Sequence, residues 1–168
     1  MWGIPYDDVK GWRGPYPPEV LAAQFEKVAV GWKPGIEELQ KAVDATPENL
    51  RAAAQADLRY ARASAIHFQS VANQTRFVMM RDALQTGASV LPMDERARMT
   101  RHLEDNIESE VALAKELFAL TREDSRIGFE PSCQYFYLPL DLVEKVINCQ
   151  WLLDAQDDMK VVGEAVDG

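Results

Sequence analysis

The sequence predicts an all-α protein, an antiparallel bundle of about four long helices. Apolar residues recur at alternating steps of three and four over four long stretches, which is the period of an amphipathic helix. Each stretch opens at a proline or a helix-capping signal, and the one β-favouring run, residues 134–138, is short. Helices this long are stable only when their apolar faces are buried, and an antiparallel bundle buries all four.

Residues 1–16 fit neither the helical nor the strand period. They interleave aromatic side chains with glycine and proline, and exposing so many aromatic side chains to water is costly. We therefore expect an extended segment that lies on a surface, either of this domain or of a second domain. The candidate contact residues are Trp2, Trp12 and Tyr16.

The first long helix is predicted to begin at Pro17–Pro18, where a missing backbone N–H costs nothing. Its apolar face contains Val20, Leu21, Phe25, Val28, Ala29 and Trp32, and the pattern resumes later with Ile36, Leu39, Ala42 and Val43. Between the two parts stands Lys33-Pro34-Gly35. We expect the helix to be kinked near Pro34, or two helices to meet there.

The second helix is predicted to begin after Thr46-Pro47, with Thr46 as the N-cap, and to end at Gly87. Its apolar positions are spaced almost as heptads: Leu50, Ala54, Leu58, Ala61, Ala65, Phe68, Ala72, Thr75 and Met79. The alanines among them form an alanine-rich face, which permits the close approach of another helix.

The third and fourth helices are predicted to open at Pro92 and at Leu138-Pro139. The core face of the third contains Met99, Leu103, Ile107, Val111, Ala114, Leu117 and Phe118. That of the fourth is expected to contain Val143, Val146, Ile147, Gln150 and Trp151. The bundle therefore spans residues 17–155, and residues 156–168 are expected to form an acidic, frayed tail.

Length and charge limit the class of protein. The 168 residues suffice for one domain, and the net charge of −9 argues against a nucleic-acid partner, which would need a basic face. An acidic chain is also unsuited to an anionic membrane surface, and no apolar run approaches the ~20 residues of a membrane span. The N-terminus does not resemble a secretory signal, so the sequence as written predicts a cytoplasmic location.

The sequence predicts no catalytic residue, no metal site and no cofactor. Di-iron bundles use Glu-x-x-His pairs, but Ser64 and Met99 stand three positions before the two histidines, His67 and His102. His102 shares a helix face with two carboxylates, Asp105 and Glu108, which we interpret as a solvated face rather than a metal site. We expect His67 to be a packing residue.

No phosphate-binding loop, GxSxG or HExxH motif is present. Cys133 and Cys149 are interpreted as small apolar packing residues, and a disulfide between them or a reactive thiol is the alternative.

The loop before the fourth helix, residues 124–137, concentrates aromatic residues among polar ones. If its backbone is extended, Tyr135 and Tyr137 point to the same side. Their rings could then stack on a sugar while polar neighbours bind its hydroxyls, and the candidate ligand-binding residues are Tyr135, Tyr137, Gln134, Glu130 and Arg126. The alternative is a loop packed on the first helix, with the tyrosine hydroxyls at helix ends.

Two stretches carry a resemblance: RGPYPPEVLAAQFEKVAVGWKPGIEEL (residues 13–39) and DSRIGFEPSCQYFYLPLDLVEKVINC (residues 124–149). Both resemble the C-terminal helical region of large bacterial proteins similar to glycoside hydrolases, in which a catalytic barrel precedes a helical bundle. The resemblance implies that any catalytic carboxylates lie upstream of Met1. Those proteins carry an Asn-His pair where this chain has Cys133-Gln134, so a binding role of that pair would be altered or lost here.

The sequence is therefore compatible with three functions. The first is a helical accessory domain that supports an upstream catalytic barrel and lends loop residues to carbohydrate binding. The second is a free-standing interaction or scaffold protein that forms a homo-oligomer through the alanine-rich face. The third, a stand-alone metal or thiol enzyme, has the least support in the sequence.

Overall fold

The computed structural model describes residues 7–86, 91–130 and 135–166, and for residues 129–130, 135–136 and 156–166 it describes the backbone alone. Four long antiparallel helices dominate: α2 (Pro18–Ala45), α3 (Glu48–Thr86), α4 (Met93–Glu123) and α5 (Pro139–Val166). A short helix, α1 (Val9–Trp12), precedes them, and a hairpin of two-residue strands, β1 (Phe129–Glu130) and β2 (Tyr135–Phe136), joins α4 to α5. The predicted all-α bundle is confirmed.

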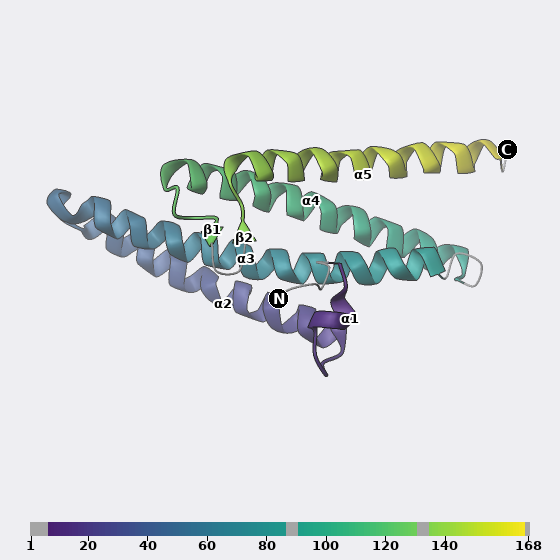
Figure 1. Ribbon diagram of the computed structural model, residues 1–168, viewed down its shortest axis with the longest axis horizontal. Helices are drawn as coiled ribbons and strands as arrows, with labels where there is room; N and C mark the ends of the chain where they lie inside the picture. The colour runs from purple at the N-terminus through teal and green to yellow at the C-terminus, as the bar shows by residue number, and fades with distance from the viewer. Residues whose placement is uncertain (1–6, 87–90, 131–134, 167–168) are drawn as a thin grey trace.

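The long helices pack in chain order (Figure 1): α2 lies along α3, α3 along α4, and α4 along α5. The first and last of them, α2 and α5, lie at opposite edges of the array. A closed four-helix bundle would bring these two helices together and bury a second side of each. The open arrangement therefore leaves one side of α5 without a helical neighbour in the described part of the chain.

The α2 helix is continuous through Pro34, so the alternative of two separate helices is excluded. Small residues, Ala22 and Ala29, are buried on its inner side. The rings of Phe25 and Phe68 stack against each other between α2 and α3, with centroids 6.2 Å apart. At the end of α2, the hydroxyl of Thr46 donates to the carbonyl of Ala42 at 2.7 Å, so this side chain closes α2.

The main core lies between α3, α4 and α5, close to the hairpin. Its fully buried members are Ala63, Ile66, Ala114, Leu117, Leu120, Ile127 and Leu142. Most come from α3 and α4, and the alanines allow these two helices to approach closely. The alanine-rich face of α3 is therefore largely occupied within the chain, because Ala61 and Ala72 are buried.

The predicted core face of the last helix is wrong in part, because Val146 packs against the core but Val143, Ile147 and Trp151 are exposed. Ile147 and Trp151 are 61% and 68% exposed, whereas Leu142 is almost completely buried at 1%. The helix is turned so that Leu142, Val146 and Cys149 face its neighbours. The sequence pattern predicts an apolar face correctly, but in an open array no other helix of the described ranges packs on that face.

The structure differs from the predicted extended N-terminal segment and the predicted frayed tail, because helices are found within both. Within the predicted extended segment, Asp8 caps α1 by accepting from the Gly11 amide at 2.8 Å, and Val9 is buried. An ion pair of 3.3 Å joins Asp7 to Arg81 of α3. At the other end, the backbone of α5 stays helical through Val166, well into the predicted tail.

None of the helices in the described ranges has the length and apolar character required to cross a bilayer.

Candidate functional site

The hairpin that carries the candidate binding residues is anchored first at its start. Asp124 follows α4 and is buried, and its carboxylate accepts from the Arg126 guanidinium through both oxygens, at 2.9 and 2.6 Å. The Arg126 backbone amide and the Tyr60 hydroxyl also donate to it, at 3.1 and 3.2 Å. The Arg126 side chain, with its backbone amide, therefore holds the pKa of Asp124 well below its usual range. The guanidinium also lies over the Tyr60 ring, 5.5 Å from its centroid, which ties the loop to α3.

A second anchor is Gly128, whose backbone is in the left-handed region with φ +87°. Its carbonyl accepts from the Tyr137 amide at 2.5 Å, which closes the hairpin beyond the β1–β2 pair. A Cβ atom at this position would overlap the Tyr137 carbonyl group and lie 3.2 Å from the Thr121 side chain. The close approach of two backbone segments therefore requires glycine.

The third anchor is a buried polar cluster between α3, α4 and α5. The carboxylate of Glu110 accepts from the Lys145 ammonium and the Ser70 hydroxyl through one oxygen, and from the Asn73 amide at 3.0 Å through the other. The Glu110 and Lys145 side chains are 9% and 20% exposed. Because a buried charge without a partner is strongly unfavourable, this ion pair depends on both members and on the hydrogen bonds around it.

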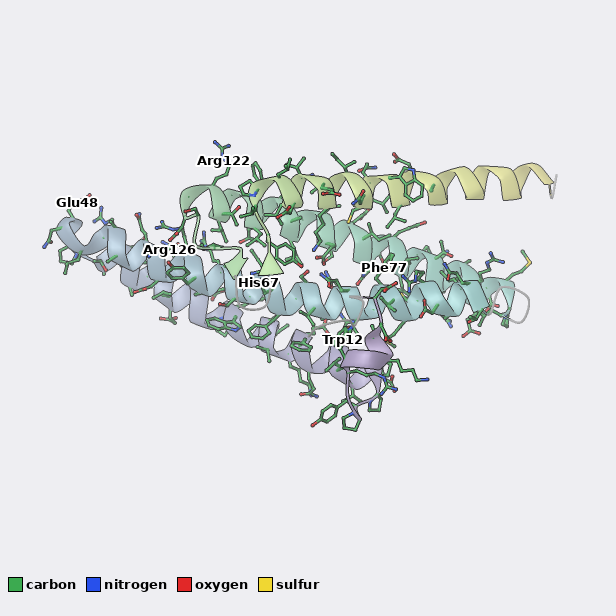
Figure 2. All side chains as sticks on the ribbon, viewed as in Figure 1. Trp12, Glu48, His67, Phe77, Arg122 and Arg126 are labelled. Carbon is green, nitrogen blue, oxygen red and sulfur yellow. The ribbon has the colours of Figure 1, made fainter. Side chains whose placement is uncertain are left out.

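Tyr137 connects the hairpin to this cluster. The Lys145 ammonium lies 5.4 Å from the centroid of its ring, and the His67 ring packs on it at 5.5 Å. Its hydroxyl accepts a long hydrogen bond of 3.5 Å from Gln74. Figure 2 shows His67 on α3 next to the hairpin. Helices α3 and α5 thus hold the end of the hairpin through one aromatic side chain.

The cluster has the residue types of a Ser–Lys nucleophile, but not the environment. The Lys145 ammonium donates both to the Ser70 hydroxyl, at 3.3 Å, and to the Glu110 carboxylate, so it is a donor to the serine rather than an acceptor of the serine proton. The adjoining cavity has a volume of about 10 Å³, room for about one water molecule. These observations favour a structural role for the cluster.

Glu110 and Lys145 also line a larger cavity of about 270 Å³. Its walls include Phe77, Ile107 and Leu152, and the Asp7–Arg81 ion pair lies at its edge. Cys149 also lines it, and burial raises the pKa of this thiol, which keeps it protonated and unreactive. The cavity is therefore an apolar space without an activated group at its wall.

Burial lowers the pKa of His67, and the nearby Lys145 charge lowers it further. The folded chain thus keeps this imidazole neutral where an unfolded chain, with a histidine pKa of 6.5, takes up a proton. Stability contributed by the neutral ring is present above about pH 6.5 and is lost as the pH falls toward the lowered folded pKa.

We expect His67→Gln to reduce the loss of stability between about pH 7 and about pH 5.5, because this side chain no longer titrates. His102→Gln is the matched control, since His102 is the other histidine of the chain and is exposed. Urea unfolding of both variants at the two pH values measures the effect. An unchanged pH dependence in His67→Gln would show that burial of His67 is not the cause.

The structure describes side-chain contacts for two of the five predicted ligand-binding residues. Arg126 is engaged by Asp124, and Tyr137 packs against α3 and α5. Gln134 lies outside the described residues, and only the backbones of Glu130 and Tyr135 are described, paired with each other across the hairpin. Of the predicted interdomain residues, Tyr16 is 59% exposed, Trp12 is half-buried, and Trp2 lies outside the described range.

The Glu110–Lys145 pair is the part of the site that the sequence analysis missed. A signal for it exists: Glu110 lies three residues after Ile107 and four before Ala114, within the apolar face of its helix. Lys145 holds the corresponding place on α5, between Leu142 and Cys149. Opposite charges within two apolar faces indicate a buried pair once the two helices are known to be neighbours.

Among the side chains that the structure describes, no group of three or more histidine, cysteine, aspartate and glutamate residues could hold a metal ion. On α4, His102 and Glu108 do not come together with Asp105 as a metal site. Cys149 forms no disulfide, and Cys133 lies outside the described residues.

Comparison of the chain with protein-family models, with curated proteins and with solved structures found no match.

Proposed function

We propose that this chain is a helical accessory domain of a carbohydrate-active, glycoside-hydrolase-like protein whose catalytic residues lie in an upstream barrel. In this proposal the bundle supports the barrel, and the hairpin between α4 and α5 is a fixed platform beside the glycan.

The observation that carries the proposal is the anchoring of the hairpin. A loop that only connects two antiparallel helices needs no special attachment. This one is held by the Asp124–Arg126 pair at its start, by Gly128 at its closure and by the Tyr137–Lys145 contact at its end. Rigid scaffolds that position a short loop are typical of binding sites, where small displacements of the contacting groups weaken recognition.

The resemblance adds a second, independent support. All of the anchoring residues just named fall within residues 124–149, one of the two stretches that resemble the helical region of glycoside-hydrolase-like proteins. The stretch that carries the resemblance thus also contains the contacts that hold the hairpin. That coincidence favours a role that depends on the position of the hairpin rather than on the helices alone.

Glycan binding is tested with Tyr135→Ala, which removes a predicted stacking ring. We expect the dissociation constant for an oligosaccharide to rise at least about tenfold while the thermal midpoint stays nearly unchanged. Tyr137→Ala should instead lower the free energy of unfolding by roughly 2–3 kcal/mol, because that ring packs on His67 and Lys145. Isothermal titration with soluble glucose-, xylose- and N-acetylglucosamine-based oligosaccharides provides the binding measurement.

Tyr16→Ala serves as the control, since Tyr16 is an exposed tyrosine outside the hairpin. The glycan role is contradicted if the wild-type chain binds none of these oligosaccharides, or if Tyr16→Ala weakens binding as much as Tyr135→Ala. A Tyr137→Ala chain as stable as the wild type would contradict the anchoring on which the proposal depends.

A further inference from the structure

The outer side of α5 exposes a continuous apolar face. Leu140, Val143, Ile147 and Trp151 follow one another at steps of three, four and four, so they lie on the same side of the helix. Leu140, Ile147 and Trp151 are 76%, 61% and 68% exposed. Single exposed apolar residues are ordinary on a protein surface, but a contiguous row of this length marks an interaction site.

The same side of the molecule also contains a groove between α4 and α5. It has a volume of about 190 Å³ and is lined almost entirely by apolar side chains, among them Phe118, Val143, Val146 and Ile147. Trp151 lies on the same helix, one to two turns beyond the α5 residues of the groove. One face thus carries both a large apolar side chain and an apolar groove next to it.

We infer that this face is a self-association surface on which a second copy of the chain packs α5 antiparallel to α5, about a two-fold axis near Ile147. In that arrangement a residue four positions after the axis opposes the residue four positions before it in the other copy. Each Trp151 then lies over Val143 of the second copy, about 6 Å along the helix from the axis. A two-fold axis thereby places each tryptophan at the other copy's groove, which is the self-complementarity that an isologous interface requires.

The accessible surface of the chain is 11182 Å², about a third more than the roughly 8,300 Å² of a compact monomer of this mass. An open array of helices leaves more side chains uncovered than a closed bundle does. A standard interface covers roughly 800 Å² on each partner.

Two further observations favour a second copy over an unrelated partner. The two helices that border the face carry exposed charges of both signs, Lys115 and Arg122 on α4 and Glu144 and Asp154 on α5. The alanine-rich face of α3, the surface predicted for self-association from the sequence, is largely buried inside the chain. This inference does not depend on the glycan proposal, because the hairpin takes no part in it.

Sedimentation of the wild-type chain from about 1 µM to about 500 µM tests the inference. We expect a dimer, and we expect Ile147→Lys to raise its dissociation constant at least about tenfold. Because residue 147 lies near the proposed two-fold axis, the two lysines would face each other, so loss of the apolar contact and repulsion between the lysines both weaken the proposed dimer. Leu50→Lys is the matched control, because Leu50 is an apolar helix residue, 56% exposed, outside this face.

A wild-type chain that stays monomeric over the whole range overturns the inference, as does Leu50→Lys weakening association as much as Ile147→Lys. Growth into larger species also overturns it, because a two-fold interface closes at the dimer. Should Ile147→Lys lower the urea midpoint, Trp151→Lys replaces it, and a Trp151→Lys chain with wild-type dimerisation contradicts the proposed register.

Discussion

Replacing Lys145 with methionine is expected to lower the free energy of unfolding by about 3 kcal/mol, at the lower end of the effect of breaking a buried ion pair. The reason is that the Glu110 carboxyl group, whose side chain is 9% exposed, loses its cationic partner in a site largely closed to water. Ser70 and Asn73 still donate to the carboxylate, but neither supplies a charge. Urea unfolding near neutral pH, followed by circular dichroism, measures the loss.

Two further variants make this prediction specific. Lys115→Met removes an exposed lysine of α4 and should change stability by no more than about 0.5 kcal/mol. Adding Glu110→Gln to Lys145→Met removes the unpaired charge, so the double variant should be more stable than Lys145→Met alone. Equal stability of the single and double variants would show that the unpaired Glu110 carboxylate is not the cause of the loss.

Gly128→Ala is expected to have an effect of similar size, about 3 kcal/mol, from two sources. An alanine in the left-handed region costs roughly 1–2 kcal/mol, and forcing a Cβ atom into a packed site costs a further 1–3 kcal/mol. The obstacle is the Tyr137 backbone, whose carbonyl carbon would lie 3.0 Å away, and a backbone group cannot rotate aside as a side chain can. Thermal and urea unfolding both report the loss.

The other glycines of the chain separate these two contributions. Gly14 has φ +62°, but no atom lies within 4 Å of the place where an alanine Cβ would stand, so Gly14→Ala should show the backbone contribution alone. Gly31 lies inside α2 with equally open surroundings, and Gly31→Ala should be neutral or stabilising by about 0.5–1 kcal/mol. The loss of stability must be larger in Gly128→Ala than in Gly14→Ala. Equal losses would rule out the contact with Tyr137 as a cause.

Much of the fold could be predicted from the sequence because helix signals are local. The prolines at positions 17, 18, 92 and 139 stand at or next to the first residues of their helices, and the apolar period identifies the buried sides of α3 and α4. Which helices pack against one another cannot be predicted from the local sequence. The predicted face of α5 is apolar as expected, yet Trp151 on it is exposed, because exposure depends on whether α2 and α5 meet.

The candidate site shows the same limit. The sequence indicates a loop that is bound to something, and the pairing of Asp124 with Arg126 is visible from their spacing. The role of Tyr137 cannot be predicted from spacing. Its contacts His67 and Lys145 lie 70 and 8 residues away in the sequence, and the packing of α3 and α5 brings them to the ring. A tyrosine that stacks on a ligand and one that anchors a loop have the same local sequence.

The central claim is that the hairpin is fixed to the bundle, and hydrogen exchange at the Tyr137 amide, which donates to Gly128, tests it most directly. We expect this amide in the wild-type chain to exchange as slowly as amides in the middle of α4. In Lys145→Met we expect it to lose protection, while the amides of α2 and α3 stay protected. An amide that exchanges in the wild type as fast as those at the chain ends would contradict the claim, and with it the proposed role of the hairpin as a platform.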